Sequence, residues 1–142
     1  MEIKAELLKP YTEEERMGFV VQNNHQLGYV IEETETELQA LGYTEEEISL
    51  QEQERIAMLN LTGANVERGI YKAKGMDFDD ILAFVMANPP VGLDVKALKI
   101  ELKANNFYRG NPYVNAVGAL LGFTSEQLDR FFETNDYREL TK

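Results

Sequence analysis

The opening of the chain alternates apolar and polar residues with the period of a β-strand. This alternation predicts three short strands, at residues 2–7, 27–31 and 34–41. Between the first two, Thr12 and Glu15 have the spacing of a capping box, which predicts a helix over 13–23. We therefore expect a small N-terminal βαββ unit, which is too small to be stable alone.

A second capping box, formed by Thr44 and Glu47, predicts a helix from residue 45 to about residue 59. The middle of this helix, residues 51–55, is polar on every side. A helix that is polar all round is typical of a bridge between two parts of a protein rather than of a helix lying on a core. It is therefore the predicted linker.

Beyond Asn60, residues suited to cap a helix recur along the chain, and each precedes apolar residues at helical spacing. The predicted caps are Thr62, Asp77, Asp94, Asn111 and Thr124. The helices are expected at residues 63–74, 78–88, 95–106, 112–121 and 125–134. The predicted fold class is thus α+β, mainly α, with a small N-terminal βαββ unit, a bridging helix and a C-terminal bundle of about five short helices.

Charge divides the chain more sharply than hydropathy does. The 142 residues carry 25 Asp and Glu against 14 Lys and Arg, a net charge of −11. Residues 1–55 hold fourteen acidic and four basic residues, whereas residues 56–142 hold eleven and ten, so the two segments carry −10 and −1. We therefore expect two domains, an acidic α+β module with the linker helix at 1–55 and a helical domain at 56–142. The acidic front half repels nucleic acid and anionic lipid and suits a basic or neutral protein partner.

Several classes of protein are disfavoured by composition. No run of about 18 apolar residues is present, and the N-terminus lacks the pattern of a secretion signal, so we expect a soluble protein with no membrane partner. The absence of Cys excludes disulfides, thiolate metal sites and cysteine nucleophiles. The expected compartment is the cytoplasm.

Catalytic motifs are also missing, so we expect no enzyme and no cofactor. His25 is the only histidine and lies in a polar turn, and no Gly-rich phosphate loop or nucleophile elbow is present. The acidic run at 77–80 suggests a calcium loop, but loop positions 6 and 12 hold Leu82 and Asn88, so helix capping explains it better. No metal site is expected. One enzymatic alternative stays open, a pair among the many carboxylates placed for glycoside hydrolysis.

Two basic or helical features have both a functional and a structural interpretation. Residues 117–131 match the small and apolar positions of a helix-turn-helix, but the second helix presents Glu126, Asp129 and Glu133, so helix packing is favoured over DNA binding.

A second feature is a stripe of three lysines on one predicted helix face, which suits either an anionic partner or a solvent-exposed surface without a partner. The stripe consists of Lys96, Lys99 and Lys103.

An aromatic turn between two predicted helices is the candidate partner-binding site. Phe107, Tyr108, Arg109 and Tyr113 flank a turn that Pro112 makes rigid. Aromatic residues and Arg dominate protein interfaces, and a rigid turn lowers the entropy lost on binding. The alternative is that these rings fill the core between the helices.

Several segments resemble small proteins encoded among bacteriophage and prophage tail genes. They are residues 9–16, His25, residues 31–43, residues 97–112 and residues 128–134. The resemblance covers nearly the whole chain, and in such proteins a similar front segment is joined to differing helical back halves. It implies no catalytic residues. It implies a role in virion assembly or in the tail, in the bacterial cytoplasm during phage assembly or in the virion itself.

The leading hypothesis is therefore a non-enzymatic accessory or assembly factor for a tail-fibre or baseplate protein. The alternative is an acidic inhibitor or decoy that occupies a basic surface of a host defence or nucleic-acid-binding protein. A decoy requires the acidic front half and a salt-dependent affinity, whereas an assembly factor is expected to bind through an apolar patch on the helical half. The sequence leaves the oligomeric state open.

Overall fold

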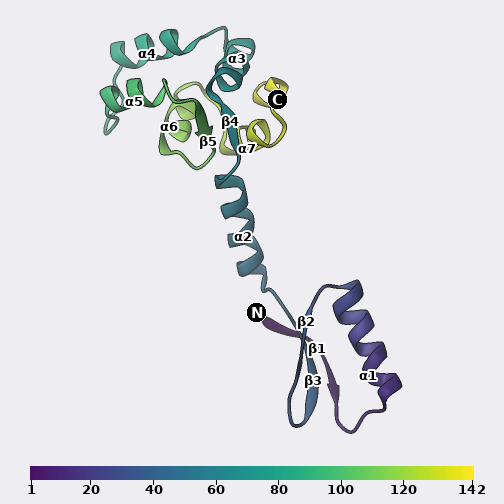
Figure 1. The fold of residues 1–142 in the computed structure, drawn as a ribbon. Helices are drawn as coiled ribbons and strands as arrows, with labels where there is room; N and C mark the ends of the chain where they lie inside the picture. The colour runs from purple at the N-terminus through teal and green to yellow at the C-terminus, as the bar shows by residue number, and fades with distance from the viewer. The chain divides into compact units, whose positions relative to one another are not determined.

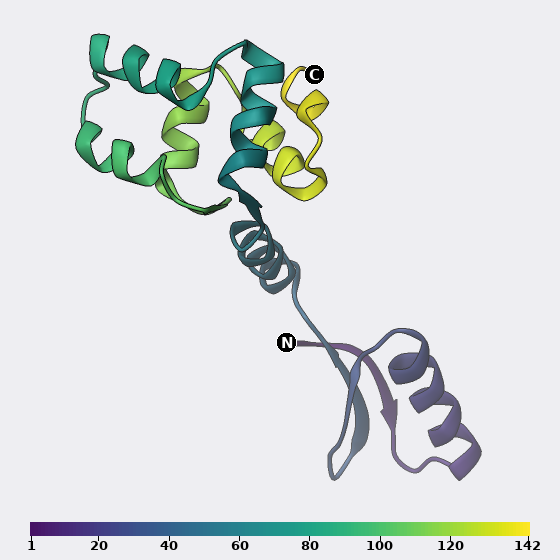
Figure 2. The same ribbon diagram turned by 45° about the horizontal axis from the view of Figure 1, so that its top comes forward.

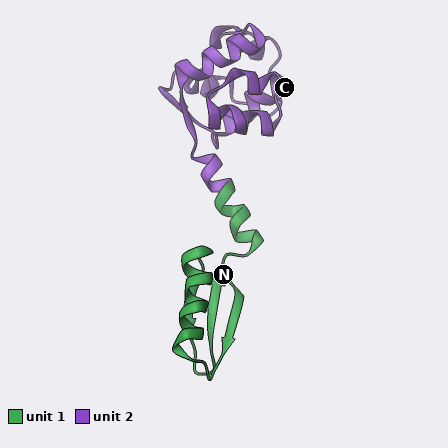
Figure 3. Ribbon diagram, turned by 90° about the vertical axis from the view of Figure 1, so that its right-hand side faces the viewer, with its two compact units in different colours: residues 1–52 green, residues 53–142 purple.

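The computed structural model describes residues 1–142 and confirms the α+β class with a mainly helical chain. The chain divides into two compact units, Met1–Glu52 and Gln53–Lys142, which we call unit 1 and unit 2 (Figure 3). The boundary between them and the boundary expected from charge both lie within one helix, α2 (Glu45–Ala57).

Unit 1 contains a three-stranded antiparallel sheet in the order β1-β3-β2 (Figure 1). The chain passes from β1 through a helix to β2, and a hairpin then places β3 between the other two strands. The register pairs Leu7 with Leu38 and Ile31 with Ala40, and a bulge shifts β1 between Ile3 and Ala5. The elements are β1 (Glu2–Leu8), α1 (Glu13–Val20), the π-helical turn η1 (Val21–Gln26), β2 (Val30–Glu33) and β3 (Glu37–Gly42).

One face of this sheet is covered by α1 and η1 (Figure 1). Successive strand residues point to opposite faces, and along β3 only Leu38, Ala40 and Gly42 are buried, so their face is the covered one. Thr12 and Glu15 form the expected capping box at the start of α1. The helix predicted over 13–23 changes to π geometry at Val21, where buried Asn23 donates a 2.9 Å hydrogen bond from Nδ2 to the Phe19 carbonyl.

The helix α2 has no buried residue. Thr44 and Glu47 cap it as expected, with the Glu47 amide donating to Thr44 Oγ1 at 3.1 Å and the Thr44 amide donating to Glu47 Oε1 at 3.1 Å. Its polar surface follows from the run of Glu and Gln between Gln51 and Glu54. The helix was expected to reach about residue 59 but ends at Ala57, because the chain becomes extended as a strand from Asn60.

Unit 2 contains all five helices expected from the sequence, together with a two-stranded sheet and a short 3₁₀ helix (Figure 2). Each α-helix of this unit has a side chain at its N-cap that accepts a backbone hydrogen bond. The elements are β4 (Asn60–Thr62), α3 (Gly63–Lys74), α4 (Phe78–Ala87), α5 (Val95–Glu101), β5 (Asn106–Tyr108), α6 (Pro112–Leu120), α7 (Ser125–Thr134) and η2 (Tyr137–Leu140).

The largest departure from the sequence prediction is in the segment after α5. This helix was expected to reach residue 106 but ends at Glu101, because residues 106–108 pair with β4 as an antiparallel strand. The register places Phe107 opposite Leu61, and both side chains are buried. Phe107 therefore enters the core from a strand and not from the end of a helix.

The core of unit 2 depends on two helical glycines that let a neighbouring helix approach closely. A Cβ built on Gly118 of α6 lies 2.6 Å from Leu128 Cδ1 of α7, which is too close for any other residue without movement. Gly69 of α3 is placed in the same way against the ring of Phe131. Phe131 is almost fully buried and packs edge to face on Phe132, with ring centroids 5.9 Å apart.

Candidate interaction surfaces

The face of the unit 1 sheet opposite α1 is not covered by a second layer, and we call it the open face. By the register, eight residues point to it in three cross-strand rows. Three of its four apolar members are well exposed, Ile3 at 47 %, Leu8 at 67 % and Val30 at 45 %, and the fourth, Leu41, is half-buried. The rows are Ile3, Leu41 and Val30, then Glu6, Gln39 and Glu32, then Leu8 and Glu37.

Three of the eight residues on the open face are carboxylates and none is basic. Glu6 and Glu37 are diagonal neighbours on β1 and β3, and a hydrogen bond between their carboxyl groups raises the pKa of Glu6 above its ordinary value. Gln39 donates a 2.9 Å hydrogen bond from Nε2 to Glu37 Oε1. The open face thus combines exposed aliphatic side chains with concentrated negative charge.

Other charged groups of unit 1 lie away from the open face. Glu33 points to the covered face, where the Tyr11 hydroxyl donates a hydrogen bond to its carboxylate. This hydrogen bond, together with nearby Lys9, lowers the pKa of Glu33, and the same hydrogen bond raises the pKa of Tyr11. The Tyr11–Glu33 contact ties the segment before α1 to β2 on the covered side of the sheet.

The sequence analysis did not single out the open face, although a signal for it was present. Leu7-Leu8 and Val30-Ile31 are pairs of consecutive apolar residues within strands. Because strand side chains alternate between faces, such a pair places one apolar residue on each face. Two pairs of this kind, one in each outer strand of the sheet, indicate that apolar residues also lie on its uncovered side.

The predicted partner-binding turn, in contrast, lies largely inside unit 2. Phe107 and Arg109 are only 4 % and 5 % exposed, Tyr113 is half-buried, and Tyr108 alone is exposed, at 49 %. The four residues therefore do not form one exposed patch. The reason is the β4–β5 sheet, whose alternation turns Phe107 and Arg109 inward and Tyr108 outward.

Arg109 organises a hydrogen-bond network at the start of α7. Its Nε donates to Asp129 Oδ1 at 2.7 Å, its Nη1 to Asn115 Oδ1 at 2.7 Å and its Nη2 to Ser125 Oγ at 2.9 Å. Its backbone amide donates to the Leu59 carbonyl at 2.7 Å. One buried guanidinium thus joins β5 to both α6 and α7, which is a structural role.

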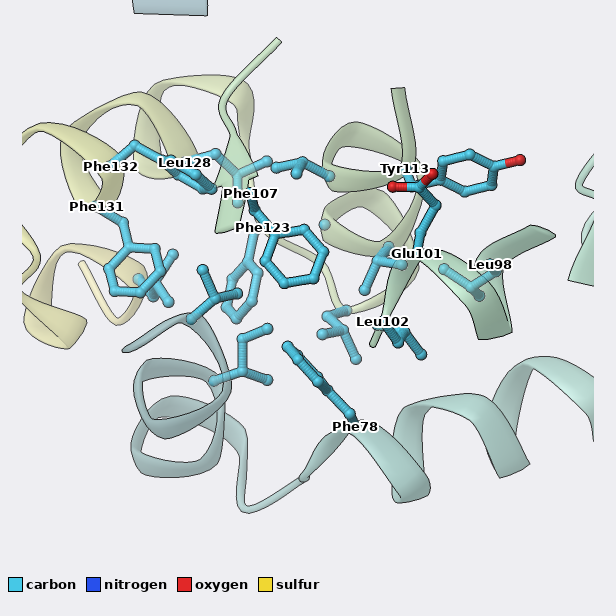
Figure 4. A pocket seen from close by; sticks show the side chains of 17 residues that line it. Phe78, Leu98, Glu101, Leu102, Phe107, Tyr113, Phe123, Leu128, Phe131 and Phe132 are labelled. Atoms are coloured by element: carbon cyan, nitrogen blue, oxygen red, sulfur yellow. The ribbon is translucent and has the colours of Figure 1, made fainter. Parts of the chain in front are cut away.

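A small apolar cavity of about 40 Å³ lies in the core of unit 2 (Figure 4). Phenylalanines from four parts of the unit line it, and Phe78 meets Phe107 edge to face with centroids 5.8 Å apart. Tyr113 also lines it, with its hydroxyl pointing away from the apolar side chains (Figure 4). A void of this size holds no ligand larger than a water molecule, and its apolar walls offer water no hydrogen-bond partner.

The helix-turn-helix interpretation corresponds to α6 and α7, which pack through Gly118 and Leu128. All three acidic residues named on α7 are in ion pairs: Asp129 with Arg109, Glu133 with Arg55, whose Nη1 lies 2.9 Å from Glu133 Oε1, and Glu126 with Arg130. The only basic residue of the helix, Arg130, pairs with Glu126 at 2.9 Å. The absence of nucleic-acid binding stays a prediction.

The lysine stripe is exposed and forms no ion pair. Lys96 and Lys99 lie on α5, whereas Lys103 lies in the turn after it because the helix ends early.

The acidic run at 77–80 caps a helix, as expected: Asp77 is the N-cap of α4, and each of Asp77 and Asp80 accepts a hydrogen bond from the backbone amide of the other. His25 is an exposed residue of η1. No three His, Asp or Glu side chains are gathered as metal ligands.

Comparison with known proteins gives no match to a family model, to a curated protein or to a solved structure. None of the helices has the length and apolar character needed to cross a membrane.

Proposed function

We propose that the protein is a non-enzymatic interaction factor of a phage or prophage tail locus that binds a tail-fibre or baseplate protein as an accessory or assembly factor. The observation that carries the interaction role is the open face of unit 1. Exposed apolar residues gathered on one surface of a small protein mark sites of association, and here Ile3 and Val30 share a cross-strand row of one uncovered sheet face, with Leu8 at the opposite end of that face.

The assignment to a tail locus rests on the sequence resemblance alone. The resembling segments lie in both units, at residues 9–16 and 31–43 in unit 1 and at residues 97–112 and 128–134 in unit 2. The proposal departs from the sequence analysis in one respect, because it places the apolar contact on unit 1 instead of on the helical half.

We further propose that the units are independent domains, a βαββ module and a helical bundle, joined by α2 as the linker. The absence of any buried residue in α2 supports this division. Unit 1 carries a net charge of −10, from thirteen acidic and three basic residues within residues 1–52.

A second candidate function is the acidic inhibitor or decoy of a basic surface on a host defence or nucleic-acid-binding protein. The carboxylates of the open face favour it, since Glu6, Glu32 and Glu37 face solvent without a neighbouring cation. The two functions differ in the identity of the partner and in how strongly the affinity depends on salt concentration.

Affinity capture from phage-infected or prophage-induced cells tests the proposed function. The bait is the full chain, and the comparison is a Leu8→Ser, Val30→Ser variant with reduced apolar surface on the open face. We expect the wild type to retain a tail-fibre or baseplate protein and the variant to lose it. Recovery of a defence or nucleic-acid-binding protein instead establishes the decoy, and equal capture by both baits removes the open face as the contact surface.

A further inference from the structure

The dimensions of the open face match one α-helix. Neighbouring strands lie about 4.8 Å apart, so the outer strands β1 and β2 are separated by roughly 10 Å, close to the diameter of a helix. β3 has six residues and spans about 20 Å, which a helix covers in about 13 residues. The opposite face already shows this arrangement, because α1 and η1 alone cover it.

The chemistry of the open face selects a basic helix. Ile3 and Val30 lie in the row at one end of the open face, and Leu8 lies in the row at the other end. The middle row between them holds Glu6 and Glu32. An acidic or neutral helix would bury these carboxylates without a partner, which is costly. Lys and Arg side chains pair with carboxylates while their aliphatic stems cover apolar surface.

A second copy of this chain is a poor occupant. Unit 1 carries a net charge of −10, so two open faces placed against each other would bring together six carboxylates and no cation. Like charges across an interface oppose association.

We propose that the open face of unit 1 binds a basic amphipathic α-helix of a partner protein, with apolar side chains of that helix on Ile3, Leu8 and Val30 and its Lys or Arg side chains beside Glu6 and Glu37. The proposal rests on the proposed function only in that unit 1 contacts a protein. It adds the conformation and charge of the bound segment.

The carboxyl pair on the open face supports this occupant. Glu6 and Glu37 share a hydrogen bond that requires a proton, and the pKa of Glu6 is raised as a result. A cation beside the pair stabilises both carboxylates in their charged form. Binding of a Lys-rich or Arg-rich helix is therefore expected to lower the pKa of Glu6 toward its ordinary value.

The test uses a synthetic peptide of about 14 residues made of Leu and Lys, with Leu at helical spacing i, i+3, i+4 and i+7. It is titrated into the full isotope-labelled chain and followed by NMR. We expect amide shifts concentrated in β1, β2 and β3, helix formation by the peptide, and an affinity that falls as salt is raised. A peptide of the same composition in scrambled order is expected to bind at least about fivefold more weakly, because it presents no apolar stripe.

Matched variants separate the open face from the general negative charge of unit 1. Glu6→Gln with Glu37→Gln removes two charges from the open face, and we expect it to weaken peptide binding about three- to tenfold. Glu13→Gln with Glu14→Gln removes two charges from exposed positions of α1, on the other side of the sheet, and is expected to change the affinity less than twofold. Leu8→Ser tests the apolar contribution in a chain of unchanged charge.

Four results overturn the proposal. Equal weakening by the two charge pairs, or equal binding of the ordered and scrambled peptides, means that only general charge attraction is present. Amide shifts confined to the outer edge of β1 or β2 mean that the sheet extends by strand addition instead. Concentration-dependent dimers that occlude the open face mean a second copy. Failure to capture a tail protein from cells, with the peptide result intact, overturns the tail-locus role alone.

Discussion

Arg109 Nε donates a 2.7 Å hydrogen bond to Asp129 Oδ1 from a side chain that is only 6 % exposed. Asp129 is one-third exposed, so the pair lies at the edge of the core with the arginine on the buried side. The guanidinium also donates to Asn115 and Ser125, which lie on α6 and α7 and are themselves exposed. Arginine is common in protein interfaces, but Arg109 has a structural role inside unit 2.

Substitution of the two neighbours in this turn is expected to give opposite results. Arg109→Ala removes the side-chain hydrogen bonds of the network and leaves Asp129 without its cation, so we expect a loss of about 1–3 kcal/mol in the free energy of unfolding. Tyr108→Ala changes an exposed strand residue and is expected to cost less than about 1 kcal/mol. Urea denaturation followed by circular dichroism measures both, and similar losses for the two variants contradict the structural role of Arg109.

Gly69 provides a test of close helix packing. Ala at this position is favoured by helix propensity, but its Cβ meets the Phe131 ring, so we expect Gly69→Ala to destabilise unit 2 by about 1–3 kcal/mol. Phe131→Leu in the Gly69→Ala background is expected to recover part of this loss. Thermal melts of the two single variants and the double variant give the coupling, and additive effects argue against the clash. Gly18→Ala in α1, where nothing lies within 4 Å, serves as the propensity control.

The helix caps show which features of the fold can be predicted from sequence. Capping at Thr62 and Thr124 is a local interaction over three residues, and α3 and α7 begin and end where the sequence analysis placed them. Pairing of Leu61 with Phe107 is not local, and no pattern in the three residues of either strand distinguishes them from a helix end. The shortened α5 and the buried positions of Phe107 and Arg109 both follow from that pairing.

The interaction surface was harder to predict than the fold. The acidic character of the front half was evident, but its arrangement depends on the register, which sets Glu6 opposite Gln39 and diagonal to Glu37. The bulge at Lys4 adds one residue to β1, and as a result the side chain of Ile3 points to the open face. A bulge has no reliable signature in a single sequence.

The Glu6–Glu37 pair makes unit 1 sensitive to pH. The pKa of Glu6 is raised in the folded state, so its contribution to stability is fully present below its ordinary pKa and is lost as pH rises through the raised value. We expect Glu37→Gln to stabilise the chain at neutral pH and to have a diminishing effect as pH falls toward the ordinary pKa of Glu. Carboxyl carbon NMR of the wild type and the variant checks this, with Glu6 titrating at a lower pH in the variant.

Asp136 has the opposite behaviour. The Arg138 guanidinium lies 2.7 Å from its Oδ2, and hydrogen bonds from Arg138 lower the pKa of Asp136 to about 2. A lowered pKa stabilises the fold above the ordinary value and loses that stabilisation as pH falls toward about 2. Arg138→Gln is expected to shift the Asp136 titration upward and to reduce the steepness of acid destabilisation in this range. An unchanged titration rules out the ion pair in solution.

Limited proteolysis tests the division into two units. We expect a protease of low specificity such as subtilisin to cut first between Leu50 and Arg55, because α2 has no buried residue and its local unfolding breaks no core contact. Mass spectrometry locates the cut. A fragment of residues 53–142 expressed alone should keep its helical circular dichroism. Loss of that signal means that the two parts share a single core.

The cavity in unit 2 has a mechanical consequence. An empty space enclosed by phenylalanines and leucines is eliminated when the chain unfolds, so unfolding reduces the volume of the system. A void of about 40 Å³ corresponds to on the order of 20 mL per mole. Hydrostatic pressure is therefore expected to destabilise the helical core around this cavity, which Phe78, Phe107 and Phe123 help to line.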